Sequence, residues 1–224
     1  MPEQMRCELI TWLDFQKLAR TLALAIAESG FEVDLIVAIA RGGLIPARIV
    51  ADYLGIMNVA SIRIEHYRGS EKAREAILRN SLSQKVTGRR VLLVDDVSDS
   101  GETFEMALRH LREHLPTAEI RTAALHHKVE SRYVPDYFAI KVIKWRWITY
   151  PWAVIEDLSG FIQAMEPRPT DITAIIERLW RDYELKIQPR VVQDVLQFMD
   201  KNAYWNSAAA SLPKRPHSAR TTKQ

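Results

Sequence analysis

Apolar residues in this chain fall into two patterns: short continuous runs, and stretches that repeat every three or four positions. Continuous runs bounded by turn residues predict buried strands, and we expect these at residues 35–39, 59–64, 90–94 and 120–125. Helical spacing predicts helices at residues 12–29, 45–54 and 103–114. Because strands and helices alternate, the pattern indicates an α/β fold built on a parallel sheet.

Two stretches stand apart from this alternation. Residues 65–88 form a charged excursion that is too long for an ordinary connection, and its composition fits a mobile lid or an exposed helical hairpin. Beyond Pro167, helical patterns begin at Thr170-Asp171 and at Gln188-Pro189. We therefore expect three parts: a core over 1–166, a C-terminal helical extension over 167–202 and a tail over 203–224.

Composition narrows the class of protein. The chain has 224 residues, of which 47% are hydrophobic and 26% charged, enough for one ordinary core. No apolar run approaches the roughly 20 residues of a membrane helix, and the first residues lack the apolar segment of a signal peptide. We expect a soluble, cytoplasmic chain without a membrane partner. Cys7 is the single cysteine, which excludes an internal disulfide and cysteine-based metal sites.

The basic charge is concentrated at the C-terminal end. The pI of about 9.0 is typical of nucleic-acid-binding proteins. However, residues 201–224 contain five basic residues and no acid, and removing these charges from the net charge of +3 leaves −2 for residues 1–200. We interpret residues 203–224 as a solvated, disordered tail and do not expect nucleic acid as a partner.

Residues 91–103 hold the most informative pattern, an apolar run, two acids and a small polar loop that leads into a helix. The adjacent carboxylates Asp95 and Asp96 suit sugar hydroxyls, and the free N–H groups of a helix N-terminus attract phosphate. Both together fit a phosphosugar. A phosphorelay receiver domain also has paired acids after a strand, but near its chain start, whereas two strand units precede this run. Neither a P-loop nor a Rossmann glycine fingerprint is present in the sequence.

The string VLLVDDVSDSGET resembles the PRPP-binding motif of type I phosphoribosyltransferases, which have a parallel-sheet core and a variable hood. The resemblance implies that the core over 1–166 carries hood elements. It also implies that Asp95 and Asp96 bind the ribose hydroxyls, directly or through Mg²⁺, and that Asp99 faces the base as the catalytic residue. The 5′-phosphate would be held by the segment from Ser98 through Thr103, which is Ser98, Asp99, Ser100, Gly101, Glu102 and Thr103. Capping of the following helix is the structural alternative for Asp95 and Asp96, and for Glu102 alone a favourable interaction with the helix dipole in the first turn is the better interpretation.

A second loop supports the resemblance that residues 91–103 indicate. Arg41, Gly42 and Gly43 follow a buried strand, as does the pyrophosphate loop of the same family. Paired glycines let backbone amides approach a ligand closely, and an arginine neutralises its charge. A tight turn is the alternative interpretation.

Base recognition is expected outside these loops. Residues 147–152 are similar to a Trp-Ile-x-x-Pro-Trp string of bacterial xanthine-guanine phosphoribosyltransferases, and Lys128 falls where those enzymes place a lysine that donates to the purine O6. By this resemblance Trp147 and Ile148 contact the base and Tyr67 belongs to the mobile loop. A half-buried aromatic strand and a solvated lysine are the plain alternatives.

The resemblance implies a purine phosphoribosyltransferase that makes a nucleoside 5′-monophosphate and pyrophosphate from PRPP and guanine, hypoxanthine or xanthine, in purine salvage. It also implies Mg²⁺ as cofactor and a homodimer or homotetramer. Adenine is an alternative acceptor, although a lysine ammonium cannot accept a hydrogen bond from its 6-amino group. A regulator that senses PRPP or a nucleotide on the same fold is an alternative of a different class.

Overall fold

The computed structural model describes residues 5–66, 76–82 and 87–202. The chain divides into two compact units, one formed by residues 16–145 and the other by residues 1–15 together with 146–224. Each unit is described by itself. The boundary that we expect at residue 166 stays a prediction, as does the tail at 203–224, which lies outside the described residues.

The unit of residues 16–145 is built on a six-stranded sheet in the order β4-β3-β2-β5-β6-β7. Its strands are β2 Leu35–Ala40, β3 Val59–His66, β4 Ala76–Asn80, β5 Arg90–Ser98, β6 Glu119–Lys128 and β7 Tyr137–Val142. Every pair is parallel except β3 with β4, which is antiparallel. The predicted α/β class with a parallel-sheet core is confirmed. A helical hairpin is wrong for residues 76–80, because these residues extend the sheet as an edge strand.

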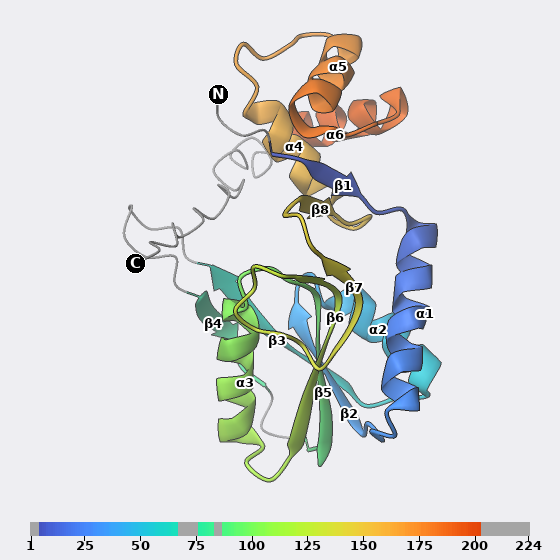
Figure 1. The fold of residues 1–224 in the computed structure, drawn as a ribbon. Helices are drawn as coiled ribbons and strands as arrows, with labels where there is room; N and C mark the ends of the chain where they lie inside the picture. Colours follow the sequence, from blue (N-terminus) through green and yellow to red (C-terminus); the bar gives the residue numbers. More distant parts are fainter. Residues whose placement is uncertain (1–4, 67–75, 83–86, 203–224) are drawn as a thin grey trace, which may run out of the picture. The chain divides into compact units, whose positions relative to one another are not determined.

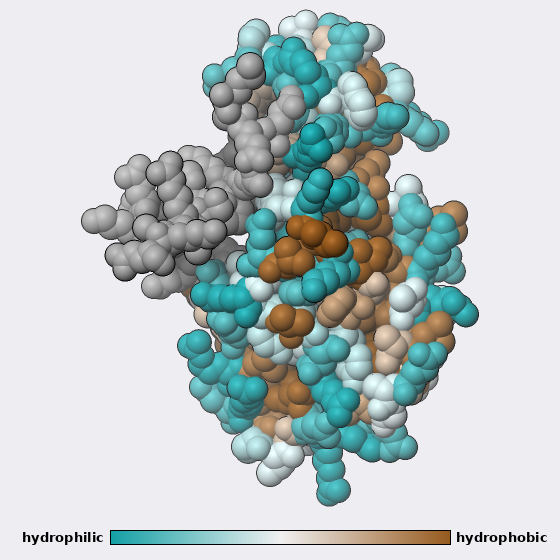
Figure 2. Space-filling model, viewed as in Figure 1, coloured by the Kyte–Doolittle hydropathy of each residue, from teal (hydrophilic) through white to brown (hydrophobic). Residues whose placement is uncertain are grey.

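Helices cover both faces of this sheet. α2 Leu44–Leu54 lies on one face together with α1 Trp12–Glu28, and α3 Glu102–His114 lies on the other (Figure 1). Phe104, Ala107 and Leu111 of α3 are buried against alternate strand residues such as Val37 and Leu93. The outward side of α3 is hydrophilic (Figure 2). This division of α3 into two faces produces the helical spacing in the sequence.

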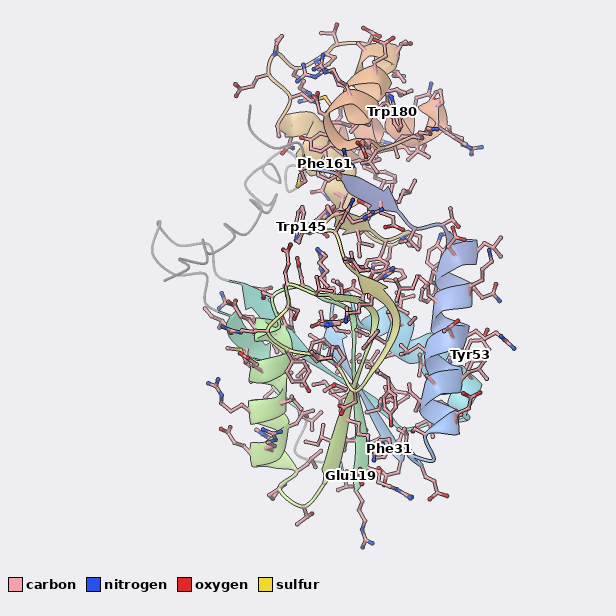
Figure 3. All side chains as sticks on the ribbon, viewed as in Figure 1. Phe31, Tyr53, Glu119, Trp145, Phe161 and Trp180 are labelled. Carbon is pink, nitrogen blue, oxygen red and sulfur yellow. The ribbon has the colours of Figure 1, made fainter. Side chains whose placement is uncertain are left out.

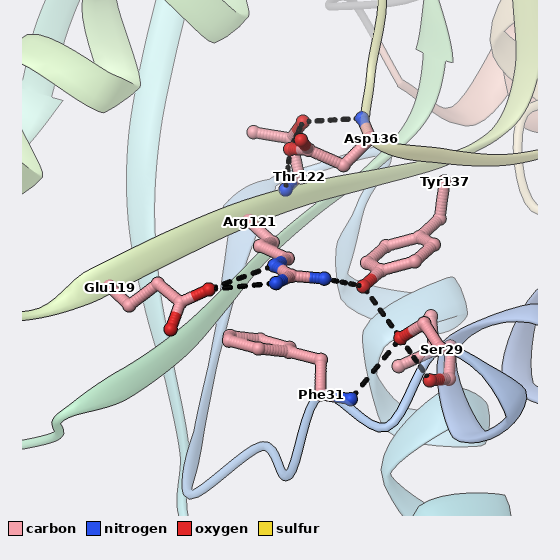
Figure 4. A network of polar contacts seen from close by, with 8 residues as sticks. Ser29, Phe31, Glu119, Arg121, Thr122, Asp136 and Tyr137 are labelled. Carbon is pink, nitrogen blue, oxygen red and sulfur yellow. Dashed lines mark hydrogen bonds and ion pairs between the residues drawn. The ribbon is translucent and has the colours of Figure 1, made fainter.

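A polar network joins the end of α1 to β6 and β7 (Figure 4). The guanidinium of Arg121 donates to the Tyr137 hydroxyl at 2.7 Å and lies 4.5 Å from the centre of the Phe31 ring. The same hydroxyl is 2.8 Å from Ser29 Oγ, at the residue that follows α1. The network thus holds the end of α1 at one edge of the sheet.

The second unit combines a small sheet with three helices. β1 Cys7–Leu9 pairs in parallel with β8 Trp147–Thr149. α4 Val154–Gln163, α5 Ile172–Tyr183 and α6 Pro189–Lys201 share a hydrophobic core with these strands, in which Phe161, Leu179 and Val195 are fully buried. The two predicted C-terminal helices are confirmed as α5 and α6. β8 agrees with the half-buried aromatic strand that was the alternative interpretation of these residues. β1 and α4 were not predicted, because a three-residue strand and a ten-residue helix carry little periodic signal.

Helix starts agree with their sequence signals. The Asp171 carboxylate accepts a hydrogen bond from the Ala174 N–H at 2.9 Å and so caps α5, and Pro189 opens α6. The Thr11 hydroxyl likewise accepts the Asp14 N–H at 3.1 Å at the start of α1. Among the helices of the described residues, none has the length and apolar character to cross a membrane.

Candidate active site

Three parallel strands end side by side at one edge of the sheet. β2 leads into the Arg41 loop, β5 carries both acids and β6 ends at Lys128. The chain leaves β2 and β5 toward opposite sides of the sheet order, so their carboxyl ends form a topological switch point, where open α/β sheets bind ligands. β5 runs on to Ser98. Asp95 and Asp96 therefore lie within the strand, beyond the predicted strand end at residue 94.

Asp95 and Asp96 form a tightly spaced acidic pair. Asp95 is 8% exposed, and its Oδ1 accepts the Asp96 backbone N–H at 2.9 Å. Burial, and next the charge of Asp96, raise the pKa of Asp95 well above its ordinary value. A cation or a set of hydroxyl donors at this point would relieve both effects, which is the chemistry expected of a ribose and metal site.

The glycine loop after β2 packs directly on this pair. A Cβ added at Gly42 would lie 2.6 Å from the carboxylate carbon of Asp96, and one at Gly43 would lie 2.7 Å from the Ile39 carbonyl oxygen. No other residue type fits here without displacing the backbone or the acid. The structure thus brings together the two loops that the sequence analysis singled out, with Arg41 exposed beside them.

The loop after β5 is held in shape by a neighbouring segment. Gly101 has a φ of 90°, in the left-handed region, and precedes the first residue of α3. A Cβ there would lie 2.7 Å from the backbone nitrogen of Tyr133. Ser98 is 1% exposed, and its hydroxyl lies 2.9 Å from Ser131 Oγ and donates to the Tyr133 carbonyl oxygen at 2.9 Å. The Ser98 side chain therefore braces the loop, and the phosphate binding expected of residues 98–103 stays a prediction.

The remaining residues of the predicted phosphate loop lie at the start of α3. The Ser100 hydroxyl accepts the Glu102 N–H at 3.3 Å. Glu102 and Thr103 belong to the first turn of the helix and are half-buried. Arg132 lies 3.8 Å from Glu102 and 2.7 Å from Glu105. Ser131, Arg132 and Tyr133 were missed by sequence reasoning, because nothing in their local pattern relates them to a loop some 30 residues earlier.

Lys128 and Asp99 form an ion pair at the end of β6. The ammonium Nζ lies 2.9 Å from Asp99 Oδ1, and the two side chains are 3% and 34% exposed. Burial lowers the pKa of Lys128, and the charge of Asp99 opposes that shift. The structure therefore contradicts the interpretation of Lys128 as a solvated loop residue. The ion pair places a hydrogen-bond donor, the Lys128 ammonium, next to an acceptor, the Asp99 carboxylate.

Trp145 is a further member of this group, and the sequence analysis did not assign it to the site. Its indole N–H donates to Asp99 Oδ1 at 3.3 Å, and its ring centre lies 4.6 Å from the Lys128 ammonium. Figure 3 labels Trp145 and Glu119 near opposite ends of the sheet, with Glu119 at the start of β6. Only the fold brings residue 145 to residue 99.

Three predicted site residues do not belong to the described part of this unit. Trp147 and Ile148 belong to the other compact unit, on β8. There the Trp147 indole N–H donates to the buried carboxylate of Asp157 at 2.9 Å, and Ile148 is 6% exposed. Tyr67 lies outside the described residues. The roles of all three stay predictions.

Comparison with known proteins identifies a matching family model, the phosphoribosyl transferase domain, over residues 8–156. A curated relative, the xanthine-guanine phosphoribosyltransferase of Gluconobacter oxydans (strain 621H), is 31% identical over 153 residues, which is 67% of this chain and 87% of the relative. α5 and α6 lie beyond the end of the family match.

Two solved structures are each similar to about two thirds of the chain. The crystal structure of purine phosphoribosyltransferase from Pyrococcus horikoshii Ot3 has a TM-score of 0.57 and 30% identity, covering 65% of this chain and 93% of that one. A hypothetical protein from Neisseria gonorrhoeae with bound ppGpp has a TM-score of 0.59 and 27% identity, covering 67% of this chain and 90% of that one.

Proposed function

Because this chain belongs to the phosphoribosyl transferase domain family, we propose that it transfers the 5-phosphoribosyl group of PRPP to a 6-oxopurine. The products are a purine nucleoside 5′-monophosphate and pyrophosphate, as in purine salvage. The sequence-based prediction of the family is confirmed. The acceptor base, the pathway, the cytoplasmic location and a homodimeric or homotetrameric state belong to the proposal.

One observation carries the choice of base, the ion pair of the buried Lys128 ammonium with the Asp99 carboxylate. The ammonium donates to an exocyclic oxygen at C6, and the carboxylate accepts a proton from a ring nitrogen of the same base. Adenine offers a 6-amino group, which is itself a donor, so Lys128 would leave it unpaired in a dry site. Guanine, hypoxanthine and xanthine all present the oxygen. The relative named as a xanthine-guanine enzyme supports this choice.

The reaction breaks the bond from the anomeric carbon to pyrophosphate and forms a bond from that carbon to a purine nitrogen. Pyrophosphate leaves with the electron pair, and Asp99 takes the proton that the base loses. Negative charge grows on the leaving group as the bond breaks, so Arg41 and the backbone amides of Gly42 and Gly43 stabilise it more in the transition state than in the ground state.

The ribose and its 5′-phosphate occupy the neighbouring loop. Asp95 and Asp96 accept hydrogen bonds from the ribose hydroxyls, while the loop of residues 98–103 at the start of α3 binds the phosphate through backbone N–H groups. The mutual repulsion of the two carboxylates and the tight approach of Gly42 fit a small divalent cation at this point. Mg²⁺ held there, directly or through water, would supply positive charge to the pyrophosphate.

The test is an assay of PRPP consumption with guanine, hypoxanthine, xanthine and adenine offered separately. We expect turnover with at least one 6-oxopurine and little with adenine. Faster turnover with adenine than with every 6-oxopurine would contradict the role of Lys128.

A nucleotide-sensing regulator on the same fold is the second candidate, and the relative with bound ppGpp is the observation that favours it. Such a protein needs phosphate-binding loops but no turnover. Calorimetric binding of PRPP and of ppGpp, run beside the assay, separates the two. Tight binding without turnover of any base would favour the regulator.

A further inference from the structure

Asp99, Lys128 and Trp145 make a closed set of three contacts. The ammonium of Lys128 and the indole N–H of Trp145 both reach Asp99 Oδ1, at 2.9 and 3.3 Å. The Trp145 ring faces the same ammonium at 4.6 Å from its centre. Each member is thus held by the other two, although they come from three separate segments of the chain.

Trp145 adds two contacts that the ion pair of Lys128 and Asp99 lacks. The Lys128 side chain is 3% exposed, so its charge gains little from water, whereas the Asp99 side chain is 34% exposed and lies in the loop after β5. A carboxylate on a loop can rotate, and a buried ammonium needs a favourable electrostatic environment. An aromatic face supplies that environment to a cation, and a fixed N–H donor limits rotation of the carboxylate.

We propose that Trp145 is a positioning residue, which orients the Asp99 carboxylate and supports the Lys128 charge for recognition of a 6-oxopurine. This inference rests on the proposed function. Within the described residues, the contacts from Lys128 and Trp145 to the Asp99 carboxylate both end on its Oδ1 atom. Oδ2 is then the oxygen that meets the proton of the incoming base.

The two functions of Trp145 separate by substitution. Trp145→Phe keeps an aromatic face for Lys128 and removes the N–H that binds Asp99. Trp145→Leu removes both. In steady-state assays with hypoxanthine or guanine, we expect Trp145→Phe to raise the KM for the base roughly tenfold, as loss of one hydrogen bond to a charged group would. Trp145→Leu should raise it further, with the KM for PRPP close to wild type in both variants.

Trp180→Phe is the matched control. Trp180 also faces a lysine, Lys186, at 5.1 Å from the ring centre, but it is 50% exposed on α5. We expect it to leave both KM values unchanged. If Trp145 were only structural, its substitution would lower the amount of active enzyme but would not change the KM for the base. The concentration of active sites in each variant is therefore measured by PRPP binding.

The indole N–H gives a readout without turnover. The chain has six tryptophans, and the indole signal lost in Trp145→Phe assigns the resonance of Trp145 in a proton–nitrogen correlation spectrum. We expect Asp99→Asn to move that resonance and Trp180→Phe to leave it in place. If the wild-type chain turns over no purine, the proposed function fails, while the spectrum still decides whether Trp145 holds Asp99.

Either of two results would overturn the inference. One is a Trp145 resonance that does not respond to Asp99→Asn. The other is a KM for the base that stays at the wild-type value in both Trp145 variants of an active enzyme.

Discussion

Burial changes the acid–base behaviour of three side chains near the carboxyl end of the sheet. It raises the pKa of Asp95, and it lowers the pKa of Lys128 and of His126. His126 is 1% exposed, and burial followed by the charge of Lys128 brings its pKa to about 4. Each shift disfavours the charged form, as expected for groups removed from water.

The first residue-scale prediction concerns Asp99. Asp99→Asn should lower kcat by about 100-fold, the lower end of the usual contribution of a general base, and should leave PRPP affinity nearly unchanged. It should also lower the pKa of Lys128, since Asp99 is the largest influence that raises it. Steady-state kinetics and calorimetry with PRPP measure the first two effects, and lysine NMR measures the third.

Asp52→Asn is the control for this substitution. Asp52 lies 2.6 Å from Arg48 on α2, with both side chains 64% exposed. We expect wild-type kcat in this variant. Losses of similar size in turnover and in PRPP affinity for Asp99→Asn would argue against its assigned role.

The second residue-scale prediction concerns His126. In the unfolded chain this histidine binds a proton near pH 6.5, whereas in the folded chain it does so only near its pKa of about 4. The free energy of unfolding therefore falls as the pH drops from 6.5 toward 4, and His126 contributes about 2 kcal/mol of that fall at pH ~5.

His126→Gln should remove this part of the pH dependence. Urea unfolding of both proteins at pH ~7.5 and ~5 measures it, and the quantity compared is the change between the two pH values. A constant stability cost of the substitution then cancels. An identical pH dependence in both proteins would contradict the pKa assigned to His126.

At the scale of elements, α2 and α3 each begin directly after a loop that contains predicted site residues. Gly43 precedes α2 and Gly101 precedes α3, and both glycines lie against backbone from another segment. The helices therefore fix where the loop amides point. α2 and α3 lie on opposite faces of the sheet (Figure 1), so the two loops lead away from its edge to opposite faces.

Gly42→Ala tests the contact between the first loop and Asp96. The added Cβ would lie 2.6 Å from the Asp96 carboxylate carbon, so the loop and the acid must separate. We expect PRPP affinity to fall at least about tenfold, equivalent to about 1.4 kcal/mol. Calorimetric titration with PRPP measures the change.

Gly55→Ala is the matched variant at the other end of α2. Gly55 has a φ of 69° and nothing within 4 Å of an added Cβ. It should lose about 1 kcal/mol of stability from backbone strain and keep wild-type PRPP affinity. Equal affinities in the two variants would show that the approach of Gly42 to Asp96 is unimportant for binding.

At the scale of the whole molecule, each of the two compact units has a hydrophobic core of its own. One core joins the six-stranded sheet to α3, and the other joins β1, β8 and α4 to the C-terminal helices. Helices that lie beyond the family match therefore stabilise the strand that carries Trp147 and Ile148.

Leu179→Ala tests this role of α5. Leu179 is fully buried in the second core, and its truncation should cost about 2–5 kcal/mol of stability in that unit. Hydrogen exchange followed by mass spectrometry should show faster exchange in α4, α5 and α6, with β2 and β5 unchanged. Leu108→Ala on α3 should produce the reverse pattern, and uniform exchange across both units in either variant would contradict two separate cores.

The sequence alone determined the parts of this protein that depend on local pattern. Apolar runs and helical spacing located β2, β3, β5 and β6 and five of the six helices among the described residues. The twin acids and the glycine loop could be predicted because strand, loop and helix follow one another within about fifteen residues, and their shared strand direction brings them to one edge of the sheet.

Only the tertiary structure determined which side chains from distant segments contact one another. The Ser98 hydroxyl is held by Ser131 and Tyr133, more than 30 residues away in the chain, while the expected phosphate binding by the loop of Ser98 stays a prediction. Trp145 reaches Asp99 across 46 residues. Side chains from distant segments meet only after strands pair and helices pack, so their contacts leave no periodic trace in the sequence. Residue types therefore indicated a phosphosugar site, and packing determined how its charges are oriented.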